Sequence, residues 1–75
     1  MRELVESIAK ALVDHPERVR VTQAAGAQSV VLELRVAPED MGRVIGKGGR
    51  IVDAIRVLVQ AAAARRGKRV LLEVI

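Results

Sequence analysis

The chain has 75 residues, of which 51% are apolar, and it contains no cysteine, phenylalanine, tyrosine or tryptophan. This length makes one domain, and such a domain buries only about 60% of the surface that its unfolded chain exposes, so dimerisation would help to stabilise it. No apolar run approaches the ~20 residues of a membrane span and no signal peptide opens the chain, which predicts a cytoplasmic protein. The lack of cysteine excludes disulfides, thiolate nucleophiles and zinc ribbons.

The net charge of +4 is unevenly distributed along the chain. Residues 43–69 carry eight basic side chains against Asp53 alone, a net charge of +7, whereas residues 1–42 carry five basic and seven acidic side chains, a net charge of −2. The usual role of such residues is a solvated surface, and the alternative is an anionic partner for the second half of the chain.

Hydrophobic periodicity predicts one helix and two strands in the first half. Apolar residues at helical spacing predict an amphipathic helix over residues 3–14, which stops at His15 because the residue before a proline avoids the helical region. Alternating apolar residues predict one strand around Val19 and Val21 and a second from Val30 to Val36. The sequence AAGAQ between them predicts a turn, so the two strands should form a hairpin.

Two further helices and a last strand follow. Pro38 suits the first position of a short helix that ends at Gly46. A longer helix comes next, capped by Gly67 and with Arg65 and Arg66 in its last turn. Its buried face is predicted to consist of Ile51, Ile55, Leu58, Val59 and Ala62. The last strand places Leu71 and Ile75 on the face opposite Val70, Leu72 and Val74. The order of elements is αββααβ.

The stretch VIGKGGR, residues 44–50, places three glycines and a lysine between the last two helices. A Walker A loop needs a serine or threonine after the lysine, and a dinucleotide-binding fingerprint needs a further glycine and a preceding strand, so both are excluded. What remains is a tight turn, Gly46-Lys47-Gly48-Gly49, in which side chains would be an obstruction. Backbone N–H groups are expected to be exposed toward the start of the following helix.

The charges around this turn also favour an anionic ligand. Arg43, Lys47 and Arg50 crowd the start of a helix, where the helix dipole already favours anions, and no acid is found before Asp53. The local positive charge is therefore expected to be uncompensated. A phosphodiester backbone would neutralise it, and the glycines would let that backbone come close.

The segment VIGKGGRIVDAI resembles the IGxxGxxI core of the KH domain, and the order of elements matches the type II version of that fold. More closely, ELRVAPEDMGRVIGKGGRIVDAIR followed by AAAARRGKRVLLEVI resembles the KhpA family of small stand-alone KH-domain RNA-binding proteins of bacteria. The resemblance covers residues 1–75. It implies the α+β class and a single type II KH domain, with a three-stranded sheet and three helices packed on one face.

The resemblance also implies a function. In KH domains the GxxG loop grips the backbone of about four unpaired nucleotides, and the bases lie in an apolar groove. The chain would then bind single-stranded RNA, as an RNA chaperone or post-transcriptional regulator, through a groove lined by aliphatic side chains, because it has no aromatic residues on which bases could stack. The candidate RNA-binding residues are Gly46, Lys47, Gly48 and Gly49 in the loop, Arg43 and Arg50 beside it, Val44, Ile45 and Ile51 in the groove, and Arg65, Arg66, Lys68 and Arg69 as a basic rim.

Some of these assignments have a structural alternative, whereas Lys47 and the glycines have none that is comfortable. Val44 and Ile51 could instead belong to the core, and Arg65 and Arg66 could simply complement the negative end of the helix dipole.

Catalysis has little support in the sequence. His15, the only histidine, has no second metal ligand near it, and Ser7 and Ser29 have no evident base, so neither an enzyme, a cofactor nor a metal site is expected. The alternative function is a dimerisation or adaptor module that has lost RNA binding. Residues 61–64, all alanine, and the half-apolar last strand could form its interface. The family resemblance implies self-association and pairing with a larger KH protein of the KhpB type, also called Jag or EloR.

Overall fold

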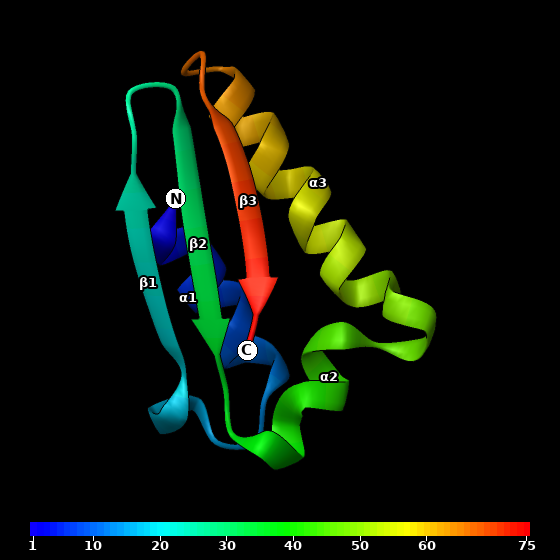
Figure 1. Cartoon of the computed structure of the whole chain (residues 1–75). Helices are drawn as coiled ribbons and strands as arrows, with labels where there is room; N and C mark the ends of the chain where they lie inside the picture. Colours follow the sequence, from blue (N-terminus) through cyan, green and yellow to red (C-terminus); the bar gives the residue numbers. More distant parts are fainter.

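The chain forms a three-stranded sheet with helices packed on one face (Figure 1), as described for all 75 residues by a computed structural model. Strand β1 (Arg20–Ala25) is antiparallel to β2 (Ser29–Arg35), which is parallel to β3 (Arg69–Val74), in the order β1-β2-β3. The helices are α1 (Arg2–Leu12), α2 (Met41–Ile45) and α3 (Arg50–Ala64). Short 3₁₀ turns span Pro16–Arg18, Pro38–Asp40 and Lys47–Gly49. The predicted α+β class and the order αββααβ are confirmed.

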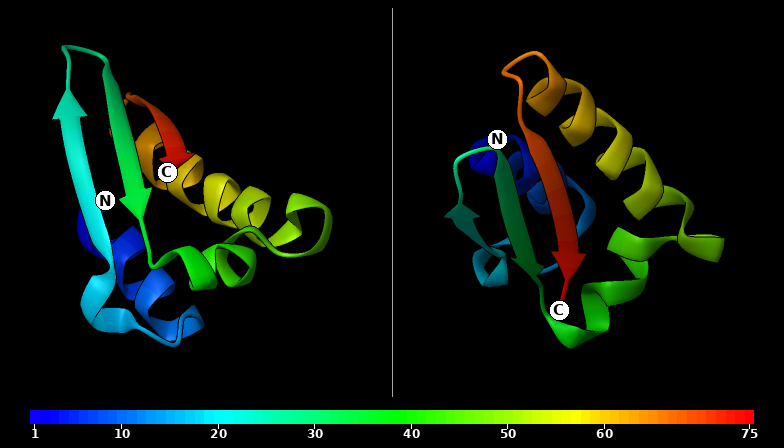
Figure 2. Two further views of the ribbon diagram at one scale, coloured as in Figure 1. Left: turned by 60° about the horizontal axis from the view of Figure 1, so that its bottom comes forward. Right: turned by 45° about the horizontal axis from the view of Figure 1, so that its top comes forward.

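The connection between β2 and β3 places the glycine-rich turn. Parallel strands cannot be joined by a hairpin and need a crossover connection. Here the crossover consists of α2, the turn and α3, and it runs outward from the end of β2 before returning along β3 (Figure 2). The turn is therefore held at one corner of the molecule between two helices, away from the sheet.

The core is entirely aliphatic and lies between the sheet and the helices. Alternate residues of each strand point into it because successive strand side chains face opposite sides of a sheet. The opposite face of the sheet stays open, and Leu71 and Ile75 are 61% and 48% exposed there, as predicted. The core cluster comprises Val5, Ala9, Val19, Val21, Val30, Leu32, Leu34, Val36, Val44, Val52, Ile55, Val59, Ala63, Val70 and Leu72.

The predicted buried face of α3 is wrong in part. Ile55 and Val59 are buried as expected, but the other core positions are Val52 and Ala63, whereas Leu58 is 55% exposed. Apolar residues surround much of this helix, and its position beside β3 selects the stripe that is buried. Ala63, which the sequence suggested for a subunit interface, is fully buried and lies in the core.

Three element boundaries also differ from the sequence prediction. Helix α1 ends at Leu12 instead of Asp14, and β1 continues through Ala25 into the predicted turn. Arg65 and Arg66 follow the end of α3 instead of lying in its last turn. The predicted cap at Gly67 is confirmed, because this residue has a φ of 67° and its N–H donates to the carbonyl of Ala64 at 3.0 Å.

The early end of α1 has a cause in Asp40, the one buried charged residue of the chain. Its carboxylate accepts hydrogen bonds from the backbone N–H groups of Asp14, at 3.2 Å, and His15, at 3.0 Å. These two residues leave the helix to reach the carboxylate. Asp40 thus ties the segment after α1 to the start of α2.

None of the three helices combines the length and the apolar character that a membrane crossing needs.

We predict that Asp40→Ala lowers the free energy of unfolding by about 1–3 kcal/mol, because it removes the acceptor of two partly buried backbone N–H groups. Urea denaturation followed by circular dichroism measures the loss. The control is Glu39→Ala at the exposed neighbouring position, which should change stability by less than about 0.5 kcal/mol. Equal effects of the two substitutions would show that the carboxylate does not stabilise this connection.

Candidate nucleic-acid interface

The GKGG turn, Gly46 to Gly49, is a closed and regular piece of backbone. The N–H of Gly49 donates to the carbonyl of Gly46 at 3.1 Å, and the N–H of Arg50 donates to the carbonyl of Lys47. The expectation that the N–H groups at the start of α3 are exposed is therefore wrong for these two. The binding of an anion at this turn would therefore depend on side-chain charge and on close approach to the backbone, because the N–H groups of residues 49 and 50 already have acceptors.

Each glycine of the turn has a backbone reason to be glycine. Gly46, Gly48 and Gly49 have φ values of 76°, 66° and 77°, a region that other residues rarely adopt. Gly46 has a second reason, because a Cβ there would lie 2.6 Å from Cγ1 of Ile51. A Cβ at Gly48 would meet nothing within 4 Å. The backbone at Gly48 is therefore the part of the turn that a large ligand can approach most closely.

The charges at the turn are only partly uncompensated. Arg43 forms an ion pair with Asp14, with 3.1 Å between Nη2 and Oδ2, so the expectation that no acid balances it is wrong. The acid comes from the segment after α1, which the sequence around the turn does not reveal. Lys47 and Arg50 are exposed and have neither an ion pair nor a side-chain hydrogen bond. These two cations are free to meet an anion.

The three apolar candidates differ in accessibility. Val44 is fully buried, so its side chain belongs to the core, and its assignment to the groove is wrong. Ile45 is half-buried at the end of α2. Ile51 is 36% exposed, and its side chain packs over Gly46. Only Ile45 and Ile51 can offer apolar surface to a ligand.

The other basic candidates lie at the far end of α3. Helix α3 has 15 residues, which corresponds to about 22 Å at 1.5 Å per residue, and the basic turn of residues 65–69 lies beyond its last turn (Figure 1). The structure therefore does not bring the basic turn and the GKGG turn together. It places them at the two ends of the surface along which α3 and β3 lie side by side.

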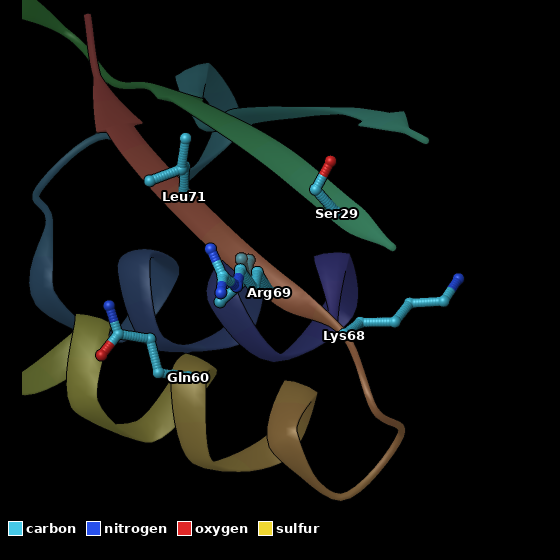
Figure 3. Close-up of a pocket in the computed structure, with 6 residues that line it drawn as sticks. Ser29, Gln60, Lys68, Arg69 and Leu71 are labelled. Atoms are coloured by element: carbon cyan, nitrogen blue, oxygen red, sulfur yellow. The ribbon is translucent and has the colours of Figure 1, made fainter. Parts of the chain in front are cut away.

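The largest groove of the molecule lies beside the basic turn and not beside the GKGG turn. It has a volume of about 530 Å³, and its lining includes Gln60 of α3 together with Arg69 and Leu71 of β3 (Figure 3). Ser29, Lys68 and Val70 complete its lining.

Arg56, which lies between the two basic regions, was not among the RNA-binding candidates and counted only as part of the polar side of the third helix. Its guanidinium crosses from α3 to β3 and donates to the backbone carbonyl of Leu72. Its charge and its helical spacing could be read from the sequence, but its partner on β3 is known only from the fold. No group of three or more His, Cys, Asp and Glu side chains is arranged to hold a metal ion.

Comparison with known proteins adds to this geometry. The family model described as KhpA/KhpB, KH domain, matches residues 2–74. The chain belongs to this KH-domain family. It is 61% identical to the RNA-binding protein KhpA of Caldanaerobacter subterraneus subsp. tengcongensis and 57% identical to that of Clostridium acetobutylicum, each over the full length of both chains. It is 48% identical to the KhpA of Aquifex aeolicus over the whole chain and 95% of that relative.

These relatives are named for binding and not for catalysis. No solved structure matches the chain with comparable significance.

We predict that Gly46→Ala destabilises the KH domain by about 3 kcal/mol and Gly48→Ala by about 1 kcal/mol. Both substitutions force alanine into a left-handed conformation, but only the first drives a methyl group into Ile51. Thermal unfolding of the two variants gives the comparison. Equal losses would mean that the contact between Gly46 and Ile51 relaxes without cost.

Proposed function

We propose that this KH domain binds single-stranded RNA, with Lys47 and Arg50 holding phosphates at the GKGG turn. The observation that carries the proposal is the combination of two exposed, unpaired cations with an unobstructed backbone at Gly48. Phosphate contacts of this kind position a strand without reading its sequence. The name of the relatives, RNA-binding protein, supports the choice of nucleic acid.

The strand would run from the GKGG turn along α3 and β3 toward the basic turn. Lys68 and Arg69 would then meet its far phosphates, and Ile45 and the aliphatic part of the groove would contact bases. Without aromatic side chains no base can stack on a ring, which removes about 1–3 kcal/mol per base. We therefore expect micromolar affinity, a loose sequence preference and weaker binding of perfect duplex. Such binding suits an RNA chaperone or a post-transcriptional regulator that acts on many transcripts.

We predict that replacing Lys47 and Gly48 together by aspartate abolishes binding to a short unstructured RNA in fluorescence anisotropy. The two carboxylates would repel the phosphates that the turn is proposed to hold. The fold should survive, because aspartate tolerates the left-handed conformation of Gly48 and meets nothing there.

A matched control is Lys10→Asp combined with Gly26→Asp, which makes the same charge change on α1 and in the hairpin turn. This control should bind RNA within about threefold of the wild type. For three or four neutralised phosphates, the logarithm of the binding constant should fall against the logarithm of the salt concentration with a slope of roughly −2 to −3. An unchanged affinity of the Lys47 and Gly48 variant, with an unchanged circular dichroism spectrum, would remove the turn from the site.

We also propose that the exposed side of α3 holds subunits together, in a homodimer that can exchange for a KhpB-type partner. Val57 and Leu58 are 65% and 55% exposed there, and exposed Ala61 lies beside them. A helix side this apolar is unusual for a surface that faces only water. Since the core already contains Ala63, the interface would use the outward residues of α3 and leave the GKGG turn open to RNA.

We predict that Leu58→Glu converts the dimer to a monomer at tens of micromolar in sedimentation equilibrium. Leu71→Glu is the matched control, because Leu71 is similarly exposed but lies on the open face of the sheet. The control should remain a dimer. A monomeric wild type would exclude the homodimer, and dissociation by Leu71→Glu alone would move the interface to the sheet.

A further inference from the structure

Arg56 is held from two sides between α3 and the outer edge of β3. Its Nε and Nη2 donate to the carbonyl oxygen of Leu72 at 3.4 and 3.3 Å, and its Nη1 donates to Oδ1 of Asp53 at 3.1 Å. β3 is an edge strand, so this carbonyl points away from β2 and would otherwise face solvent. A backbone acceptor and a carboxylate thus fix the plane of the guanidinium.

This arrangement leaves a defined pair of donors. A guanidinium has five N–H groups, one on Nε and two on each Nη. Leu72 and Asp53 use three of them, the single one on Nε and one on each Nη, so one N–H remains on Nη1 and one on Nη2. The side chain is 42% exposed, so a ligand can reach these two groups. Because the guanidinium is already oriented, little side-chain freedom is lost when both are used.

The proposed path of the RNA passes this pair of donors. Arg56 lies seven residues after Gly49, about 10 Å along α3, on the side of the helix that faces β3. The 530 Å³ groove follows one turn later, at Gln60. A strand whose phosphates are held at the GKGG turn therefore brings a nearby base to Arg56.

We propose that Arg56 determines base specificity, by selecting a base that offers two adjacent hydrogen-bond acceptors. Guanine offers O6 and N7, and cytosine offers N3 and O2. Adenine and uracil alternate donors and acceptors along their edges, so each leaves one of the two N–H groups of Arg56 unpaired. This inference rests on the proposed RNA binding and adds to it a preference for guanine or cytosine at one position.

The alternative role of Arg56 is purely structural, as a brace that covers the edge of β3. A brace would affect stability and the affinity for every RNA to the same degree. A specificity residue changes the ratio of affinities between RNAs, so this ratio is the measurement that separates the two roles.

The test uses oligouridine and three variants of it in which the central base is guanine, cytosine or adenine, with anisotropy at one salt concentration. The wild type should bind the guanine or the cytosine oligonucleotide about fivefold tighter than the adenine and uridine ones. Arg56→Lys keeps the charge but loses the planar pair of donors, so it should bring all four affinities within about twofold of each other. Arg35→Lys, on the open face of the sheet, should keep the preference.

A second measurement changes the RNA and leaves the protein intact. If guanine is the preferred base, 7-deazaguanine lacks the N7 acceptor and should bind as weakly as uridine. If cytosine is preferred, 2-thiocytosine weakens the O2 acceptor and should lose most of the gain.

Equal affinities of the wild type for all four oligonucleotides would overturn the specificity role and leave the RNA-binding function standing. A preference that persists in Arg56→Lys would overturn it as well. Absence of binding to any of them would overturn the RNA-binding function itself.

Discussion

The contact between Ile51 and the bare α-carbon of Gly46 determines the geometry of the whole candidate site. The first turn of α3 can approach the end of α2 only because residue 46 has no Cβ. This approach leaves room for only a 3₁₀ turn of Lys47 to Gly49 between the helices, and the turn in turn requires positive φ values at Gly48 and Gly49. The exposure of Lys47 and Arg50 follows from this packing, so a packing constraint in the fold also shapes the place where we propose that phosphates bind.

The sequence predicted most accurately the features that depend on near neighbours along the chain. Strand alternation, the glycine cap at Gly67 and the turn between two helices are local patterns, and the structure has each of them. The buried face of α3 was predicted less well, because Ile51, Val57 and Leu58 make much of its circumference apolar. Only the position of β3 decides that Val52 is buried and Leu58 is not. Secondary structure was therefore predictable, and the choice of face required the tertiary fold.

In the candidate site too, the turn is a local feature of the sequence, whereas its surroundings depend on the tertiary fold. The GKGG turn could be located from the sequence, but the partners of its neighbours come from distant segments. Asp14, which pairs with Arg43, precedes the β1–β2 hairpin in the sequence. Leu72, whose carbonyl orients Arg56, belongs to the last strand. The exposed pair of Asp14 and Arg43 is worth little in free energy, so a phosphate can still displace the carboxylate. The basic residues around the turn therefore differ in availability: Lys47 and Arg50 have no ion pair, whereas Arg43 is paired with Asp14.

Three sides of helix α3 point in different directions: one faces β3, one is exposed and one packs on the core. Residues two apart on a helix project about 200° from one another, so Arg56, which reaches β3, and Leu58, which is exposed, lie on nearly opposite sides. Val59 and Ile55 are buried on a third side and keep the helix fixed against the core. A partner bound over Leu58 therefore need not touch the surface between α3 and β3. The surface proposed for RNA and the side of α3 proposed for subunit contacts therefore point in different directions, so the two proposed roles are sterically compatible.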